Sequence, residues 1–525
     1  MSIEADFARQ NIEALLESMS LEEKIGQLFL LAFSKDRVDE ARILMQDHFV
    51  GASYVSNDNV PSAAAAVELT GRLQGFAANT RLHIPLILGV DQEGAWSVLT
   101  GESCPGPGNM ALGASRDPET AYRMYYLIGQ EMSAVGLNTI YAPAVDCNSN
   151  PYNSIIGMRS FGESPSLVAE MGAAAVRGAR AGGVLTTIKH FPGHGDTIAD
   201  SHRDIPHVTR SREELLAIDL FPFAEGIRAG ADMVMTSHII FDALDPVCPA
   251  TLSPRILNGM LRDEMGFDGV ILSDSMNMQA MKRFYRPADA AIRAFNAGVD
   301  LLMLAEEHYN HNANAYLYEQ LSLINAVCDA ARSGVISKYR LNDAVRRVLL
   351  LKQRLQPTNY RPETIGSAEH KAIELDIARK ALSFLRGGDG FVPITAADQL
   401  VLVNATTRSS YPPVTQTRGI GPNQSVAAFD ELVRHVQARH PHTAVISAEE
   451  LLDGTGSPAI PADAKVIAVT ENYPLPGMDF DQQSQPKVIA RLLGAHPDLI
   501  VVALRDPYEL VNFPDVQTYL CAFSF

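Results

Sequence analysis

Short apolar runs recur along most of the chain, and segments with helical periodicity separate them. A short apolar run bounded by turn residues is typical of a buried strand. Eight strands are predicted in this way, at 26–33, 50–55, 85–91, 138–146, 184–190, 232–238, 269–274 and 299–304. Helices are predicted between them, among others at 62–78, 118–135, 166–181, 212–229 and 253–265. This strand-helix alternation predicts an α/β fold with a parallel, TIM-like (β/α)8 barrel.

A polar stretch containing two prolines, 355–362, follows the helix predicted at 337–354. We therefore divide the chain into a barrel domain at 1–355, a linker at 356–370 and a smaller α/β domain at 371–525. The strands predicted in that second domain are 399–404, 443–447, 465–470 and 498–504. The apolar segment 519–525 is expected to dock into the same domain, because apolar side chains are unusual at a free terminus.

Reactive polar side chains stand at the ends of five of the eight predicted barrel strands. They are Asp91, Asp146, Lys189 with His190, Ser237 with His238, and Asp274. One such residue could simply cap the helix that follows it. In a TIM-like barrel, however, the carboxyl ends of all the strands face one mouth, where active sites lie. Five strand ends together therefore favour an active site over helix capping.

The densest group of reactive residues is the loop at 189–202. Its candidate metal ligands are His190, His194, Asp196, Asp200 and His202. Pro192–Gly193 breaks the helix that would align two of these histidines, Lys189 would place a positive charge beside the ion, and no HExxH motif is present. We favour proton transfer, with His202 as general acid and base and Asp200 orienting its ring. No metal and no cofactor are therefore expected.

Three positions outside that loop also suggest chemistry. Asp274 ends a predicted strand, where its carboxylate could attack a carbon electrophile or stabilise an oxocarbenium-like centre. Asp91 could accept hydrogen bonds from two sugar hydroxyls, and Arg159 offers donors in a fixed fork. Asp268, before the same strand as Asp274, is expected at the opposite end of the barrel with a structural role.

Charge and cysteine content narrow the choice of partner and compartment. The 525 residues include 43 Lys and Arg against 61 Asp and Glu, a net charge of -18. This balance argues against nucleic acid or an anionic membrane as the main partner and favours a substrate that is neutral or locally recognised. Five cysteines without CxxC spacing indicate reduced thiols. With neither a signal peptide nor a membrane-span run recognised, we expect a cytoplasmic protein.

Taken in order, seven segments resemble the glycoside hydrolase family 3 β-N-acetylglucosaminidases. They are GVDQEG at 89–94, PGNMALGA at 107–114, RSFG at 159–162, KHFPGHGDT with DSH at 189–202, ADMVMTSH at 231–238, PATLS at 249–253 and GFDGVILSDSMNM at 266–278. The resemblance implies a retaining hydrolase that releases terminal β-linked N-acetylglucosamine, with muropeptides and chitin oligomers both open as substrates. It implies Asp274 as nucleophile and His202 as acid and base, assisted by Asp200. The residues implied to hold the sugar are Asp91, Arg159, Lys189 and His190.

The chain departs from the family pattern after Gly94, where relatives carry an arginine and this chain has none up to Thr100. Trp96, the only tryptophan, could stack on a sugar face or pack in the interior. A family 3 β-glucosidase and an N-acetylglucosaminide phosphorylase stay open as activities. A histidine acid would repel an incoming phosphate less than a carboxylate would. A sugar-binding protein without activity would need neither Asp274 nor the dyad.

Overall fold

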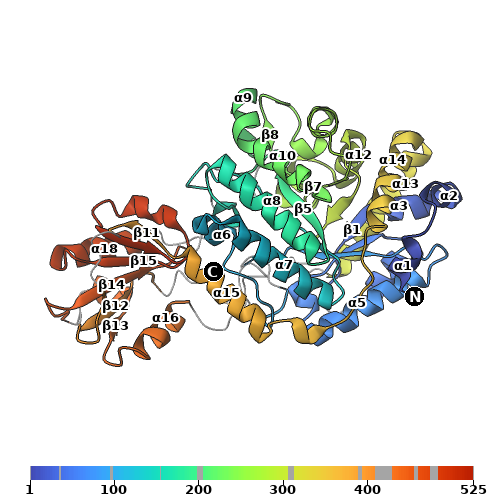
Figure 1. Cartoon of the computed structure of the whole chain (residues 1–525). Coiled ribbons are helices and arrows are strands. Elements are labelled where there is room, and N and C mark those ends of the chain that lie inside the picture. Colours follow the sequence, from blue (N-terminus) through green and yellow to red (C-terminus); the bar gives the residue numbers. More distant parts are fainter. Residues whose placement is uncertain are drawn as a thin grey trace.

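The computed structural model describes residues 2–34, 37–94, 99–153, 155–197, 205–305, 313–387, 393–407, 428–453, 459–472 and 483–523. These residues form a barrel and a smaller sheet domain beside it, with the smaller domain coloured orange to red in Figure 1. Among them, no helix has both the length and the apolar character that crossing a bilayer requires.

All eight predicted barrel strands are present. They are β1 Phe29–Leu31, β2 Ala52–Tyr54, β3 Ile87–Val90, β4 Thr139–Ile140, β5 Leu185–Phe191, β7 Met233–Thr236, β9 Val270–Leu272 and β10 Leu302–Leu304. They pair in parallel in the order β10-β1-β2-β3-β4-β5-β7-β9. A parallel bridge from Leu272 to Leu301 joins the two ends of this sheet. The predicted fold class, a TIM-like barrel followed by a smaller α/β domain, is confirmed.

Helices cover the outside of the barrel. They are α1 Ile3–Phe7, α2 Ile12–Ser18, α3 Leu21–Gly26, α4 Val38–Arg42, α5 Ala63–Ala78, α6 Asn109–Ser115, α7 Pro118–Ala134, α8 Pro165–Ala181, α9 Arg212–Glu214, α10 Leu220–Arg228, α11 Gln279–Phe284, α12 Pro287–Ala297, α13 Ala313–Arg332 and α14 Lys338–Lys352. A π-helix, Arg255–Glu264, stands where an ordinary helix was predicted at 253–265. Another π turn, Leu215–Asp219, divides the helix predicted at 212–229, because Pro222 has no N–H to continue the regular ladder.

Several barrel strands are shorter than predicted, for local reasons. The segment predicted as a strand at 138–146 pairs regularly only at Thr139–Ile140. Pro143 has no N–H to donate, so the regular ladder stops there. A single bridge from Ala144 to Lys189 and a hydrogen bond from the Val145 N–H to the Lys189 carbonyl keep the chain beside β5. Asp146 therefore still arrives at the carboxyl end of the barrel.

The C-terminal domain is a six-stranded sheet in the order β11-β16-β15-β14-β12-β13. Its strands are β11 Ser383–Arg386, β12 Leu400–Asn404, β13 Ala444–Ile446, β14 Lys465–Thr470, β15 Ile500–Ala503 and β16 Thr518–Cys521. Its helices are α16 Ala428–Gln437, α17 Ala448–Leu452 and α18 Ser484–Ala495. The four strands predicted here are present, and the apolar end of the chain forms β16 between β11 and β15. β11, which is mostly exposed and antiparallel to β16, was not predicted.

The C-terminal domain and the barrel share apolar contacts. Helix α15, Ala368–Ala381, begins within the stretch predicted as a linker and packs against α6 and α7 of the barrel. Met110 and Ala111 of α6 are buried in the same apolar cluster as the core of the C-terminal sheet. The two domains are therefore joined by packing as well as by the chain itself.

Candidate active site

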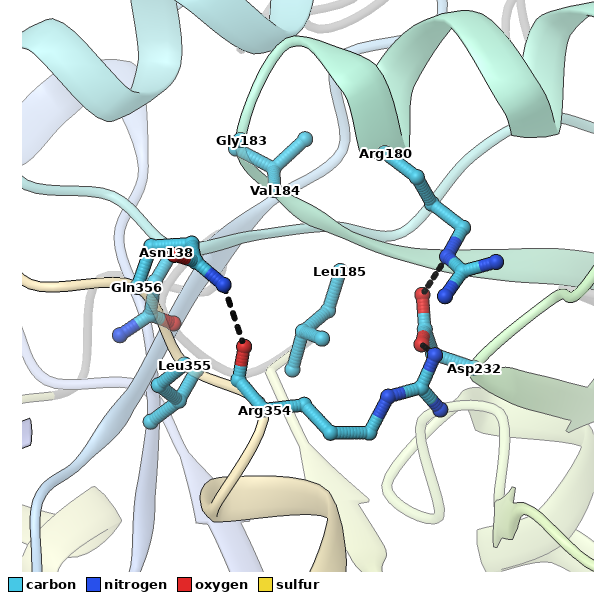
Figure 2. A pocket seen from close by; sticks show the side chains of 9 residues that line it. All are labelled: Asn138, Arg180, Gly183, Val184, Leu185, Asp232, Arg354, Leu355 and Gln356. Atoms are coloured by element: carbon cyan, nitrogen blue, oxygen red, sulfur yellow. Dashed lines mark hydrogen bonds and ion pairs between the residues drawn. The ribbon is translucent and has the colours of Figure 1, made fainter. Parts of the chain in front are cut away.

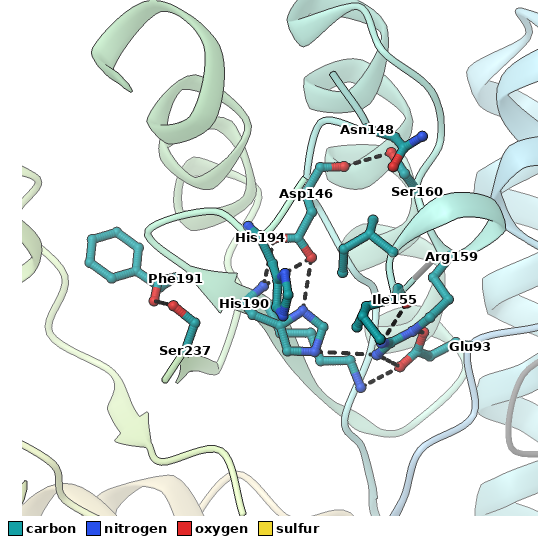
Figure 3. Close-up of polar contacts among 12 residues, drawn as sticks. Glu93, Asp146, Asn148, Ile155, Arg159, Ser160, His190, Phe191, His194 and Ser237 are labelled. Atoms are coloured by element: carbon teal, nitrogen blue, oxygen red, sulfur yellow. Dashed lines mark hydrogen bonds and ion pairs between the residues drawn. The ribbon is translucent and has the colours of Figure 1, made fainter. Parts of the chain in front are cut away.

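The structure brings all four residues predicted to bind sugar into one ion-paired cluster at the carboxyl ends of the barrel strands. Asp91 directly follows β3, while Lys189 and His190 lie in β5. Arg159 ends the short 3-10 helix Gly157–Arg159. The Lys189 Nζ lies 2.6 Å from the Asp91 Oδ1. The Arg159 Nη2 lies 3.2 Å from the His190 Nε2, and Figure 3 shows these two side chains converging.

Glu93 occupies the centre of this cluster, although sequence reasoning assigned it no role. Arg159 donates from Nε and Nη2 to the two Glu93 carboxylate oxygens, each at 2.8 Å. Lys189 pairs with the same carboxylate. Burial alone would raise the pKa of Glu93, but the charges of Arg159 and Lys189 lower it to about 2. The sequence held one signal for a role of Glu93. It is a second carboxylate, two residues after Asp91, and two of the predicted sugar-binding residues, Lys189 and Arg159, are cations that need counter-charges.

Glu93→Gln is expected to destabilise the fold, because it leaves buried Lys189 and Arg159 without a full counter-charge. Breaking a buried ion pair on one side costs about 3 to 5 kcal/mol of unfolding free energy. Urea unfolding measures the loss. The matched control is Glu225→Gln, which breaks a surface pair with Arg228 and is expected to cost less than about 1 kcal/mol. Equal losses in the two variants would contradict the central role of Glu93.

Asp146 fixes the orientation of His190. The Asp146 carboxylate accepts hydrogen bonds from the backbone N–H groups of His190 and His194, and its Oδ2 lies 2.8 Å from the His190 Nδ1. A guanidinium can only donate, so the His190 Nε2 must accept from Arg159 and the Nδ1 must carry the proton donated to Asp146. Asp146, seen in the sequence only as a polar strand end, thus sets the tautomer of a predicted sugar-binding residue.

His194 makes the fold sensitive to acid. Burial, and then the neighbouring His190, lower the pKa of the His194 imidazole to about 4. In the unfolded chain the imidazole takes up a proton near pH 6.5, whereas in the folded chain it resists protonation down to about pH 4. The unfolding free energy should therefore fall by about 3 kcal/mol as the pH drops through this window.

The prediction is tested by measuring urea unfolding as a function of pH in two variants. His194→Gln is expected to flatten the dependence between pH 6.5 and pH 4. His207→Gln, which removes an exposed imidazole, is expected to keep the parent's slope. A slope that is unchanged in His194→Gln would contradict the assignment.

Asp274 stands at the carboxyl end of β9 as a half-buried carboxylate. Its Oδ1 accepts a hydrogen bond of 2.7 Å from the Ser275 N–H. Burial would raise the pKa of Asp274, but His238, His190, this N–H and Lys189 together hold it below its ordinary value. The lowered pKa keeps the Asp274 carboxylate ionised at neutral pH.

The predicted dyad, Asp200 and His202, lies outside the described residues, and so does Trp96. The structure therefore gives no geometry for the acid and base. In the part of the chain that is described, no three His, Cys, Asp or Glu side chains gather in a way that could hold a metal ion. His190 and His194 of the metal alternative both lie beside Asp146, with ring centroids 5.7 Å apart.

A cavity of about 290 Å³ lies at the other end of the barrel, where β4, β5 and β7 begin (Figure 2). Asp232, which precedes β7, is buried there and pairs with the Arg354 Nη2 at 2.5 Å and the Arg180 Nε at 3.6 Å. These pairs join the carboxyl ends of α14 and α8 to the floor of the barrel. The predicted strand 232–238 thus carries a structural carboxylate at one end and polar site residues at the other.

Ionised Asp274 and the set of fixed donors and acceptors share one mouth of a parallel barrel, the end at which TIM-barrel enzymes carry their active sites. Residues 20–351 match the model of the glycosyl hydrolase family 3 N-terminal domain. The chain therefore belongs to glycoside hydrolase family 3, and it is a glycosidase.

Named relatives match over nearly the whole chain. A β-hexosaminidase A of Pseudoalteromonas piscicida is 30% identical over 508 residues, which are 92% of this chain and 84% of the relative. A β-N-acetylglucosaminidase/β-glucosidase of Cellulomonas fimi is 27% identical, over 98% and 90% of the two chains. A solved family 3 β-N-acetylglucosaminidase from Paenibacillus sp. str. FPU-7 superimposes with a TM-score of 0.83 and 32% identity, covering 97% of this chain and 94% of its own.

Proposed function

We propose that this glycosidase is a β-N-acetylhexosaminidase that releases terminal β-linked N-acetylglucosamine from a carbohydrate substrate. One observation carries the proposal: Asp91, Lys189 and Arg159 are fixed by ion pairs at the mouth where Asp274 stands. Rigid carboxylate and guanidinium groups suit hydroxyl and acetamido groups, because each presents several acceptors or donors in a fixed geometry. The similarity to named β-hexosaminidases supports an N-acetylated sugar.

In the proposed mechanism, Asp274 attacks the anomeric carbon while His202 protonates the departing oxygen. A glycosyl ester forms on Asp274 as the glycosidic bond breaks. Water then attacks the same carbon and gives its proton to His202, so that the Asp274 carboxylate is regenerated. Two displacements retain the β configuration of the sugar. Asp200 orients the His202 ring and stabilises its charged form.

Product analysis tests the function. The enzyme is incubated with a chromogenic β-N-acetylglucosaminide and with the matching β-glucoside, each with and without phosphate, and the products are followed by proton NMR. We expect β-N-acetylglucosamine as the first product, at a rate that phosphate does not change. A sugar 1-phosphate would reassign the enzyme as a phosphorylase. Faster cleavage of the glucoside would make it a β-glucosidase, an activity that the name of the Cellulomonas fimi relative includes.

Prolonged chelation with EDTA, followed by dialysis, is expected to leave turnover unchanged, because the proposed mechanism assigns every proton transfer and the attack to side chains. Activity on the chromogenic substrate before and after treatment measures this. Loss of activity that zinc restores would instead favour the metal-site interpretation of the histidine-rich loop.

We also propose a cytoplasmic role in carbohydrate metabolism such as peptidoglycan recycling. An odd number of cysteines without CxxC spacing supports a reducing compartment. The natural substrate class is identified by comparing kcat/KM for an N-acetylglucosaminyl muropeptide with kcat/KM for chitobiose. A clear preference for chitobiose would contradict the recycling role.

A further inference from the structure

The C-terminal domain touches the barrel beside Arg159, a proposed sugar-binding residue. Met158 is a partly buried residue that packs against the apolar cluster in which Met110 and Ala111 of α6 join the core of the C-terminal sheet. Arg159 is the next residue, yet its guanidinium lies in the barrel mouth with Glu93 (Figure 3). Adjacent residues of one short helical turn thus connect the second domain to the sugar-binding cluster.

Helix α6 provides a second connection. Its first residue, Asn109, is fully buried and donates from Nδ2 to the Arg159 carbonyl at 2.6 Å. The Asn109 Oδ1 accepts a hydrogen bond of 2.8 Å from the Tyr125 hydroxyl, which fixes the amide. Gly113 of the same helix lies against the segment that follows Arg159. A Cβ at position 113 would lie 1.7 Å from the Phe161 carbonyl oxygen, so this close approach requires glycine. The helix that enters the C-terminal core therefore also holds the Arg159 backbone.

A third connection comes from the turn after β15. Tyr508 lies in the 3-10 helix Pro507–Asn512, and its phenol interacts with the side chain of Asn148. The Asn148 Oδ1 accepts a hydrogen bond of 3.2 Å from the Gly157 N–H, which begins the turn that carries Arg159. The backbone at the start of this turn is thus held by Asn148, whose side chain in turn interacts with Tyr508 of the C-terminal domain.

We propose that the C-terminal domain is the positioning element of Arg159: packing of Met158 holds the guanidinium in its sugar-binding orientation and so sets the affinity for the sugar. The inference rests on the proposed role of Arg159 in sugar binding. Met158 and Met110 are positioning residues, because they act on the sugar only through Arg159. The domain thereby contributes to sugar recognition through Arg159.

The experiment compares three variants of the full chain. Met158→Ala removes a side chain that packs against the apolar cluster shared by the two domains, and Met158→Leu replaces it with one of similar size. Val488→Ala is the matched control, because Val488 of α18 is fully buried in the same apolar core. The measurements are KM and kcat on a chromogenic β-N-acetylglucosaminide, and amide hydrogen exchange of the peptide around Arg159.

Met158→Ala is expected to raise KM about tenfold with little change in kcat, because binding in the ground state and in the transition state weaken together. Exchange around Arg159 is expected to accelerate in the same variant. Met158→Leu should restore both values, and Val488→Ala should lower stability while KM stays that of the parent.

A parent-like KM in Met158→Ala, or an equal rise in Val488→Ala, would overturn the inference. Faster exchange without a change in KM would overturn it as well. Failure of the proposed function gives a different result, since the unsubstituted enzyme would then leave the N-acetylglucosaminide uncleaved. In that case KM for the sugar that it does cleave, together with the exchange data, still decides whether the second domain positions Arg159.

Discussion

Asp274→Ala is expected to lower turnover by about 10⁴-fold or more while the protein stays folded, because it removes the atom that forms the covalent bond. The loss should be the same for good and poor leaving groups. The control is Asp268→Ala at the other end of the same strand, where the carboxylate is 98% exposed and lies 3.7 Å from Arg347. This control is expected to keep the turnover and stability of the parent.

Covalent trapping identifies the nucleophile directly. A slow fluorinated substrate should add one sugar mass to the enzyme, and peptide mapping should place it on Asp274. Asp91 and Glu93 also face the mouth, but both are held in ion pairs with Lys189. Label on either of them, or substantial activity in a folded Asp274→Ala protein, would refute the assignment of Asp274.

His202→Ala is expected to impair cleavage of substrates with poor leaving groups by about 10² to 10⁴-fold, and of activated aryl glycosides far less. The reason is that a good leaving group departs with little protonation. Asp200→Ala should show the same selectivity more mildly, because the imidazole remains but is no longer oriented. The measurement is the slope of log kcat/KM against leaving-group pKa, which should steepen in both variants.

His207→Ala is the control for the dyad. His207 belongs to the short strand β6, His207–Val208, and its exposed ring pairs with Asp242 at 3.1 Å. This variant should keep the parent's slope. If His202→Ala also kept the parent's slope and lost activity uniformly, the loop would be structural and the acid and base would have to be sought elsewhere.

The barrel itself could be predicted because each of its strands is a short apolar run between polar turns. Such a run reflects the burial of residues that follow one another in the sequence, so it can be recognised locally along the chain. The same reasoning placed Asp91, Lys189 and Asp274 at one mouth, since parallel strands end on the same side. Strand β11 was not predicted because Ser383–Arg386 is largely exposed and therefore lacks the apolar run that is typical of a buried strand.

What the sequence by itself determined was the order of the strands, the end of the barrel that carries the chemistry, and the family resemblance. Only the tertiary structure decided which charges meet. Glu93 neutralises Arg159 from 66 residues away, and Asp146 orients His190 from 44 residues away. The packing of Met158 against the apolar cluster that joins the two domains likewise left no local signal. Ion pairing and packing depend on distance in space, whereas hydrophobic periodicity reports only on neighbours along the chain.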